Sequence, residues 1–260
     1  MKRPSVWFVV PAYGRLEISQ VCLRQLRRTC DDLAAAGIDA TAVVMADDEN
    51  LATARALEFG TIERKNRPLG RKWNDGFQAA CDPAWNPHPA DYAIPFGSDD
   101  WIDARWALAQ LEADGDLRCS RQSAVVREDG RMLMRLNIRY EQHGGPAFGD
   151  GVRMIPARLL ATAGYRPAEE DVDRAIDTSV WRRLTNTAGA LRVSFAEVHP
   201  LQIVDFKSPV GQLNAYRDCL AFRDGDEDRD PWRSLAEIYP LEAIREMQEL
   251  YGMVDQAVAA

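Results

Sequence analysis

The sequence contains few cysteines, and they do not occur in pairs. Five cysteines, an odd number, are spread over 260 residues without a C-x-x-C motif. A disulfide framework is therefore not indicated. The pattern predicts reduced thiols in a reducing compartment, the cytoplasm. The residues are Cys22, Cys30, Cys81, Cys119 and Cys219.

A long hydrophobic run is also lacking. The first residues, "MKRPSVWFVVPAYGR", place basic residues before apolar ones as a signal peptide does, but the apolar run "VWFVV" stops at Pro11. This run is too short for the hydrophobic region of a signal peptide. Because no other segment is long enough to cross a bilayer, the sequence predicts a soluble protein.

Two nucleotide-binding fingerprints are absent, because no segment matches GxxxxGK[ST] or GxGxxG. An excess of positive charge is absent too, since 32 Lys and Arg against 40 Asp and Glu give a net charge of −8. This balance argues against a protein held on nucleic acid by its overall charge, but it leaves local basic patches open. The 46% hydrophobic and 28% charged residues are typical of a globular protein. The length allows one large α/β domain, with or without a tail.

Apolar runs and helical patterns alternate through the first hundred residues. "SVWFVVP" is a continuous apolar run, typical of a strand that is buried on both faces. Strands that alternate with helices indicate a mostly parallel sheet between layers of helices. The predicted strands are residues 5–11, 40–46, 61–66 and 91–96, and the predicted helices are residues 18–33, 50–60 and 73–81.

The second half has a different character. Residues 131–140, "RMLMRLNIRY", put apolar side chains on one face, which predicts an antiparallel strand with a basic outer face. The other expected elements are a glycine-rich loop at 142–151, helices at 156–163 and 172–186, two short strands in 191–206 separated at His199-Pro200, an acidic linker at 222–231, and one or two amphipathic helices at 232–256.

Polar stretches follow all four predicted strands of the first half, namely "PAYGR", "ADDEN", "NRPLGRKWND" and "GSDDW". In open α/β sheets, ligands bind beyond the carboxyl ends of the strands. Asp99 and Asp100 supply hard oxygen ligands that suit a divalent cation, and the basic "RPLGRK" suits phosphates bound to that cation. The site therefore fits a nucleoside diphosphate. The plainer alternative is that Asp99 caps a helix beginning near Trp101.

These motifs resemble, in order, those of family 2 nucleotide-sugar glycosyltransferases. "VVPAYGR" is similar to the V-P-x-Y-N-R opening of that family, and "AIPFGSDDW" resembles its strand ending in D-x-D-D. "PLGRKWNDGFQAA" is similar to a family helix through Gly70, Asn74, Gly76 and Ala80, and "FGDGVRMIPARLLATAGYRP" with "IDTSVWRRL" resembles the acceptor half. The resemblance covers residues 5–206.

The resemblance implies a GT-A fold, a Rossmann-like three-layer α/β/α arrangement with a mixed, mostly parallel central sheet. The expected domain covers residues 1–222, with a donor half at 1–103 and an acceptor half at 104–222. An acidic linker and a helical tail follow at 223–260. The implied activity is transfer of a sugar, with inversion, from a nucleoside-diphosphate sugar (a UDP-sugar is favoured) to a hydroxyl acceptor, with Mn²⁺ or Mg²⁺ as cofactor.

The resemblance also implies roles for individual residues. Asp177 is the expected base that deprotonates the acceptor, with Glu169, Glu170, Asp171 and Asp173 as alternatives. The expected metal ligands are Asp99, Asp100 and His199, although a histidine before a proline is often purely structural. Donor binding is assigned to Pro11, Ala12, Tyr13, Asp47, Asp48, Gly70, Lys72, Asn74 and Lys207.

Four positions depart from the family pattern. Gly97 stands where the first Asp of D-x-D is expected, and Gly14 replaces an Asn. Ile176 and Ser179 replace acidic residues of the E-D-x-D-L motif. The base assignment is therefore less well supported by sequence than the donor half.

Arginines are concentrated between Arg118 and Arg139. Arg131, Arg135 and Arg139 are spaced four apart and share one face of a strand, which suits a polyanionic acceptor. DNA with hydroxymethylated pyrimidines, which some virus-encoded enzymes of this type glycosylate, is one such acceptor. Protein side chains, lipid-linked sugars and polysaccharides are the others. Alternatively, the arginines form the solvated face of an edge strand.

Two other classes remain as alternatives. A sugar-1-phosphate nucleotidyltransferase has a similar architecture, but its G-x-G-x-R loop is missing after the first strand. A non-catalytic module that binds nucleotide, carbohydrate or nucleic acid with the same fold is the second alternative.

Overall fold

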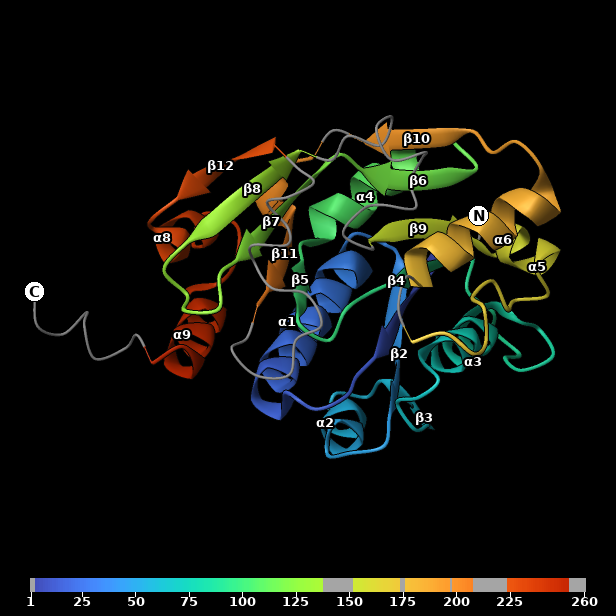
Figure 1. The fold of residues 1–260 in the computed structure, drawn as a ribbon, viewed down its shortest axis with the longest axis horizontal. Coiled ribbons are helices and arrows are strands. Elements are labelled where there is room, and N and C mark those ends of the chain that lie inside the picture. The colour runs from blue at the N-terminus through green and yellow to red at the C-terminus, as the bar shows by residue number, and fades with distance from the viewer. Residues whose placement is uncertain (1–2, 138–151, 174–175, 197, 208–223, 253–260) are drawn as a thin grey trace, which may run out of the picture.

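The computed structural model describes residues 3–137, 152–173, 176–196, 198–207 and 224–252. Its main sheet has seven strands in the order β10-β6-β9-β4-β1-β2-β3 (Figure 1). β9 runs antiparallel to both of its neighbours and the other pairs are parallel. The strands are β1 (Ser5–Pro11), β2 (Asp39–Ala46), β3 (Gly60–Glu63), β4 (Tyr92–Pro95), β6 (Leu117–Ser120), β9 (Arg153–Pro156) and β10 (Val193–Ala196).

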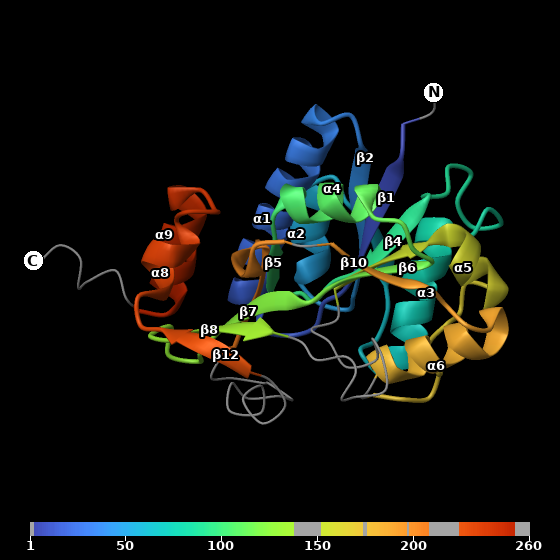
Figure 2. The same cartoon turned by 90° about the horizontal axis from the view of Figure 1, so that it is seen from above.

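Helices cover both faces of this sheet. One core lies between the sheet and α1, α2 and α4, and a second core lies between the sheet and α3, α5 and α6 (Figure 2). The predicted mixed, mostly parallel three-layer arrangement is therefore confirmed. The helices are α1 (Leu16–Ala35), α2 (Asn50–Ala56), α3 (Leu69–Cys81), α4 (Ala104–Glu112), α5 (Ala157–Thr162) and α6 (Ile176–Ala188).

The buried strand β1 follows directly from its residues. Val6 and Phe8 pack into one core, whereas Val9 packs into the other. Successive side chains of a strand point to opposite faces, so a continuous apolar run fills both cores at once. The predicted strand at residues 5–11 is confirmed.

The first two helices end where left-handed residues occur. α1 stops at Ala35, and Gly37 follows with a φ of 87°, as the sequence predicts. α2 is shorter than predicted, because it stops at Ala56 and Glu58 has a φ of 59°. Gly60 then begins β3 instead of ending the helix.

Helix α3 lies unusually close to β1 and β2. A Cβ atom on Gly76 would lie 2.5 Å from Cγ1 of Val9 and 2.6 Å from Cε of Met45. The helix can therefore approach the sheet only because residue 76 has no side chain. This packing accounts for the second glycine of the "PLGRKWNDGFQAA" motif.

A second sheet of five strands, β12-β8-β7-β11-β5, extends the molecule. β11 runs parallel to β7 and antiparallel to β5, and β8 runs antiparallel to both β7 and β12. A short helix, η2 (Pro200–Gln202), separates β10 from β11 as predicted. The strands are β5 (Asp100–Ile102), β7 (Gln122–Val126), β8 (Leu133–Asn137), β11 (Ile203–Phe206) and β12 (Asp224–Asp228).

The acidic stretch predicted to be a linker is instead partly a strand. β12 pairs with β8 so that Asp226 lies opposite Arg135. Arg135 Nη2 lies 3.0 Å from Asp228 Oδ2. The acidic residues are thus placed where they pair with a basic strand, a long-range contact that composition alone does not reveal.

The arginine strand also differs from its prediction. β8 begins at Leu133, and Arg131 lies in the turn before it. Leu133 is fully buried in the same core as Trp232, so α8 (Pro231–Leu235) covers the face that was expected to be solvated. The predicted loop at 142–151 lies outside the described residues.

The last two helices belong to the core of the second sheet. Trp232 of α8 stacks on Phe206 at 6.4 Å between ring centroids. α9 (Leu241–Leu250) packs against α1, where Arg24 and Glu246 form an ion pair of 2.9 Å. In the part of the chain that the structure describes, no helix is long and apolar enough to span a membrane.

Because α8 shares this core, we expect Leu235→Ala to lower the free energy of unfolding by about 2–5 kcal/mol. Leu235 is fully buried, whereas Leu241 of α9 is 62% exposed. Leu241→Ala is the matched control and should change stability by less than about 0.5 kcal/mol. Urea unfolding followed by circular dichroism measures both values. Equal effects of the two variants would contradict the packing of α8.

Candidate functional site

The carboxyl ends of three parallel strands lie level at one edge of the main sheet. Pro11 at the end of β1 is opposite Met45 of β2, and Val9 is opposite Pro95 of β4. Ala12 N donates a hydrogen bond to Met45 O at 2.9 Å. The polar stretches that follow these strands therefore meet at this edge, as predicted.

The segments after β1 and β2 are tied together by Asp48. Its Oδ2 accepts from Gly14 N at 3.0 Å, and its Oδ1 accepts from Asn50 N at 3.0 Å and Asn50 Nδ2 at 2.8 Å. Both carboxylate oxygens of Asp48 thus already accept hydrogen bonds, from Gly14 and from Asn50. Asp47 beside it is exposed, which leaves Asp47 as the better placed of the two predicted base-binding carboxylates.

Lys72 is fully buried beneath these segments, so it is not a solvated residue on the surface of α3. Its Nζ donates to Ala12 O at 2.6 Å and to Asn66 Oδ1 at 3.3 Å. It lies 5.9 Å from the ring of Tyr13, which is 54% exposed. Burial lowers the pKa of Lys72 to about 8, although the charges of Asp47 and Asp48 oppose this shift.

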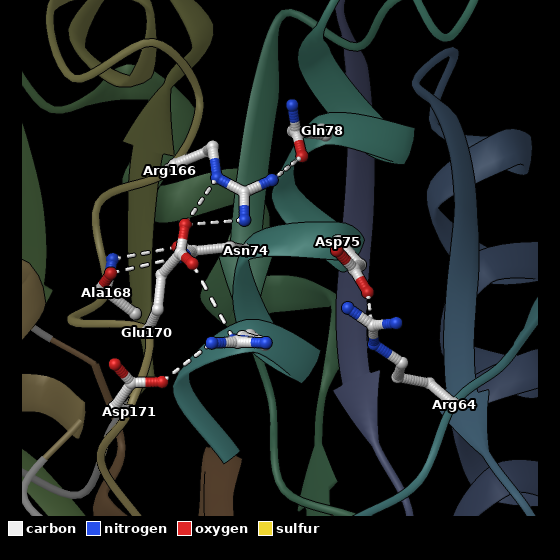
Figure 3. Close-up of polar contacts among 9 residues, drawn as sticks. Arg64, Asn74, Asp75, Gln78, Arg166, Ala168, Glu170 and Asp171 are labelled. Atoms are coloured by element: carbon white, nitrogen blue, oxygen red, sulfur yellow. Dashed lines mark hydrogen bonds and ion pairs between the residues drawn. The ribbon is translucent and has the colours of Figure 1, made fainter. Parts of the chain in front are cut away.

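Gly70 and Asn74, two other predicted donor ligands, make contacts within the protein, and their predicted role stays a prediction. The Asn74 amide pairs with Ala168 through two hydrogen bonds of 2.9 Å (Figure 3). Gly70 N donates to Val172 O at 2.9 Å, and a Cβ at residue 70 would lie 1.8 Å from Glu169 O. Both residues therefore hold α3 against the segment at 166–173.

The acidic residues of that segment are held by basic ones. Arg166 bonds to Gln78 at 2.6 Å and to Glu170 at 2.7 Å (Figure 3). The remaining ion pairs are Arg71–Asp171 at 2.8 Å, Arg71–Glu170 at 3.7 Å and Arg182–Glu169 at 3.2 Å, while Asp173 Oδ1 accepts from Leu69 N at 2.9 Å. The alternative base residues are thus engaged in binding α3 and α6.

The adjacent aspartates that follow β4 have different surroundings. Arg15 Nη1 lies 2.5 Å from Asp99 Oδ2, while Asp100 Oδ2 accepts from Gly97 N at 3.0 Å. A Cβ on Gly97 would lie 2.6 Å from Asp100 Oδ2, so the carboxylate of Asp100 fills the space that an aspartate at residue 97 would need. Asp103, not Asp99, caps the next helix, because its side chain accepts from Arg105 N.

Asp100 lies opposite a second partly buried carboxylate. In the antiparallel pairing of β5 and β11, Asp100 is opposite Asp205. Burial raises the pKa of Asp100 well above its ordinary range, and the charges of Asp205 and Asp99 raise it further. Lys207 opposes this shift, and its Nζ pairs with Asp205. The ammonium predicted to close over phosphates is therefore bound to a carboxylate here.

His199 caps the short helix η2. Its Nδ1 accepts a hydrogen bond from Leu201 N at 3.3 Å. Within the described residues, no group of three or more His, Cys, Asp or Glu side chains is arranged to hold a metal ion. A structural role for His199 thus has direct support, whereas its predicted role as a ligand has none.

The fit of a divalent cation depends on Asp99. Mg²⁺ is commonly bound by one or two carboxylates together with substrate phosphates, so a cage of three protein ligands is not required. Asp99 lies at the correct edge, with 15% of its side chain exposed. Asp100 fits less well, because its Oδ2 already accepts a hydrogen bond from Gly97 N. The residues therefore fit a divalent cation that is bound by Asp99 on one side and by phosphate oxygens of a substrate on the other.

Asp177 lies in the first turn of α6 and contacts a buried arginine. Arg153 Nη1 is 3.2 Å from Asp177 Oδ1, and the side chains are 3% and 42% exposed. β9 pairs with β4 so that Ile155 is opposite Ala93. Continued by two residues, this register places Arg153 level with Pro95. Arg153 and Asp177 thus lie at the same sheet edge as the predicted donor residues.

Sequence reasoning missed Arg15 and Arg153 as members of the site. Arg15 was visible as the last residue of "PAYGR", directly after a strand end. Arg153 was visible as a lone charge at the start of the apolar strand "RMIP". A charge in such a position needs a partner, and this signal could have been used.

Of the three arginines predicted to bind the acceptor, Arg131 is exposed and Arg135 pairs with other side chains. Arg135 Nη2 lies 3.0 Å from Asp228 Oδ2 and 3.3 Å from Ser234 Oγ. Arg131 is exposed, and its backbone N donates to Asp129 Oδ1. Arg139 lies outside the described residues.

No protein-family model matches the chain, and no curated protein sequence matches it. Solved structures do match. S. aureus TarS aligns with a TM-score of 0.53 and 14% identity over 78% of this chain and 60% of that chain. A Mycobacterium tuberculosis glucosyl-3-phosphoglycerate synthase in complex with Mg²⁺ and UDP aligns with a TM-score of 0.50 and 12% identity over 80% of this chain and 73% of that chain.

These similarities establish the fold. The chain has the GT-A fold of nucleotide-sugar glycosyltransferases, as predicted. At 12–14% identity the comparison shows the architecture and not the activity. The alignment also spans less than two thirds of the TarS chain.

The buried ammonium of Lys72 gives a pH-dependent stability that can be measured. An unfolded lysine keeps its proton up to about pH 10.4, whereas the folded protein releases it near a pKa of about 8. The free energy of unfolding therefore rises with pH across this window and falls as pH drops through 8. Between pH 7.5 and 9, we expect a gain of about 1 kcal/mol relative to Lys72→Met.

Denaturant titrations at both pH values test this expectation. Lys65→Met, at an exposed lysine, is the matched control and should leave the pH dependence of wild type unchanged. An identical pH dependence for Lys72→Met and wild type would show that Lys72 is not buried as an ammonium.

Proposed function

We propose that the protein is a glycosyltransferase that moves a sugar from a nucleoside-diphosphate sugar, with a UDP-sugar favoured, to a hydroxyl acceptor. The observation that carries this proposal is the meeting of Tyr13, Asp47, Lys72 and Asp99 at one edge of a GT-A sheet. Ligands bind at this edge in open α/β sheets. The aligned Mycobacterium tuberculosis synthase was solved with UDP and Mg²⁺, which supports the donor class.

The donor half, residues 1–103, supplies the nucleotide site in this proposal. The exposed ring of Tyr13 offers a face on which a base stacks, beside Pro11 and Ala12. The carboxylate of Asp47 accepts a hydrogen bond from an N–H of the base, as uracil provides. Asp48 fixes the loop that carries Tyr13. Lys72 adds positive charge beneath these groups.

Asp99 is the proposed protein ligand of a divalent cation, Mn²⁺ or Mg²⁺. The bound cation would supply positive charge that neutralises the leaving diphosphate. Asp100 stabilises the segment that carries Asp99 by accepting a hydrogen bond from Gly97 N. His199 could bind the cation only if its Nδ1 released the N–H of Leu201. Lys207 could bind the phosphates only if its ammonium left Asp205.

Asp177 is the proposed general base in the acceptor half, residues 104–222. A carboxylate across the sugar from the leaving group removes the proton of the attacking hydroxyl, which gives inversion in a single displacement. Arg153 fixes the position of Asp177. The other candidate carboxylates, Glu169, Glu170 and Asp171, have weaker support, because their ion pairs hold the segment at 166–173 against α3 and α6, whereas Arg153 holds Asp177 at the edge where the strands end.

The acceptor carries a hydroxyl group in this proposal, and several classes of molecule supply one. Hydroxymethylated DNA was suggested by the arginine strand, but Arg135 pairs with Asp228, so the strand does not favour a polyanion over other acceptors. Protein, lipid-linked sugar and polysaccharide hydroxyls remain in the same proposal. The cytoplasm fits the four described cysteines, which are buried and free.

A non-catalytic binding module is the second candidate. The pairing of Asp99 with Arg15 favours it, because this carboxylate is neutralised without a metal. Turnover of a sugar donor separates the two candidates, since a binding module binds nucleotide without hydrolysing or transferring the sugar.

Titration calorimetry of UDP, GDP, CDP and dTDP, with and without Mn²⁺, tests the donor site. We expect metal-dependent binding of UDP, and we expect Asp99→Asn to weaken it by at least about 10-fold in the presence of Mn²⁺. Asp31→Asn, which removes a surface carboxylate paired with Arg27, is the matched control. Undiminished metal-dependent binding by Asp99→Asn would rule out Asp99 as the ligand.

A second experiment tests the base. We expect Asp177→Asn to bind UDP as wild type does but to transfer sugar about 10²–10⁴-fold more slowly, because only proton transfer is lost. Glu169→Gln, at a carboxylate paired with Arg182, should keep most of the activity. Full activity of Asp177→Asn with any acceptor would assign the base to another residue.

A further inference from the structure

An ion pair joins the segment after β1 to the segment after β4. Arg15 Nη1 lies 2.5 Å from Asp99 Oδ2, and the two side chains are 21% and 15% exposed. A charge-assisted hydrogen bond in a partly desolvated position is stronger than one at the surface. The carboxylate oxygen nearest to Arg15 is therefore covered by a guanidinium group in the donor-free protein.

Arg15 is electrostatically coupled to more than one carboxylate. The negative charges of Asp99, Asp205 and Asp100 all stabilise the positive charge of Arg15. Asp100 and Asp205 face each other across β5 and β11, and Lys207 pairs with Asp205. Three carboxylates thus lie near two cations. Arg15 is the cation that pairs with Asp99, whereas Lys207 pairs with Asp205.

The backbone of Arg15 is fixed, so any exchange of partners must come from its side chain. Arg15 has a φ of 45° and directly precedes α1, and its carbonyl accepts from Ser19 N at 3.0 Å. Gly14 beside it is tied to Asp48. A long side chain on a fixed backbone can change partners without a change of fold.

We propose that Arg15 is a displaceable counter-ion of Asp99. In the donor-free protein it occupies the carboxylate that binds the divalent cation, and it is displaced when the cation arrives together with a nucleoside diphosphate. This inference rests on the proposed function, because it takes Asp99 as the metal ligand. Arg15 is thus a positioning residue that links metal binding to donor binding.

The physical reason is the free energy of the displaced guanidinium. A cation that arrives alone must break the Arg15–Asp99 pair and leave Arg15 without a partner in a half-buried place, which is unfavourable. A diphosphate that arrives with the cation brings oxygens that bind the released guanidinium well. Metal and nucleotide should therefore each strengthen the binding of the other.

Titration of Mn²⁺ followed by electron paramagnetic resonance, with and without UDP, tests this coupling. For wild type, we expect weak Mn²⁺ binding alone and binding that is tighter by about 10-fold or more with UDP. For Arg15→Gln, we expect Mn²⁺ alone to bind about 10-fold or more tightly than to wild type, so that the effect of UDP shrinks. A merely structural role of Arg15 would weaken Mn²⁺ binding instead.

Three further variants complete the design. Arg15→Lys keeps a cation and should behave like wild type, which covers the case in which Arg15→Gln does not fold. Arg27→Gln, on the same helix and paired with Asp31, should leave Mn²⁺ binding unchanged. The double variant Arg15→Gln/Asp99→Asn should lose the gained affinity, which places the bound Mn²⁺ at Asp99.

The outcomes separate the two proposals. Suppose that Arg15→Gln and wild type bind Mn²⁺ equally well without UDP, and that both still bind UDP in a metal-dependent way. This result would overturn the counter-ion role and leave the proposed function standing. Absence of Mn²⁺ binding and of UDP binding in every variant would overturn both. Tight Mn²⁺ binding by wild type without UDP would also overturn the counter-ion role.

Discussion

The parallel pairing of β1 with β2 and β4 is the constraint on which the rest of the structure depends. Parallel strands in register end at the same edge, so the residues that follow Pro11, Ala46 and Pro95 meet there. The contact of Arg15 with Asp99 bridges two of these segments, and β5 of the second sheet begins at the next residue, Asp100. The candidate site is thus a consequence of strand order.

Close approach of backbones is the second condition, and glycines permit it. A side chain at Gly76 would overlap β1 and β2, and a side chain at Gly70 would overlap the backbone of Glu169. At Gly97 the carboxylate of Asp100 fills the available space. The departure from D-x-D at residue 97 is therefore part of the packing around Asp100, whose carboxylate lies where the side chain of residue 97 would be.

Local patterns predicted the first half well because its signals are local. The apolar run of β1 and the helical stripe of α1 each fill a core without help from distant residues, and both elements lie where they were expected. The acidic stretch at 222–231 was misread, because β12 forms only by pairing with β8. Arg135 was predicted to bind the acceptor or to lie in solvent, and its ion pair was missed for the same reason, since its partner Asp228 is 93 residues away.

The sequence by itself determined the alternation of strands and helices, the mostly parallel sheet and the set of polar residues at the strand ends, because these depend on periodicity and order along the chain. The GT-A fold was predicted from the resemblance of its motifs to those of a family. Only the tertiary structure decided which of those residues face one another. It buried Lys72 under Ala12, paired Asp48 with Gly14, and placed Arg15 on Asp99. Such pairings depend on the approach of segments that are distant in sequence, and that approach is set by packing.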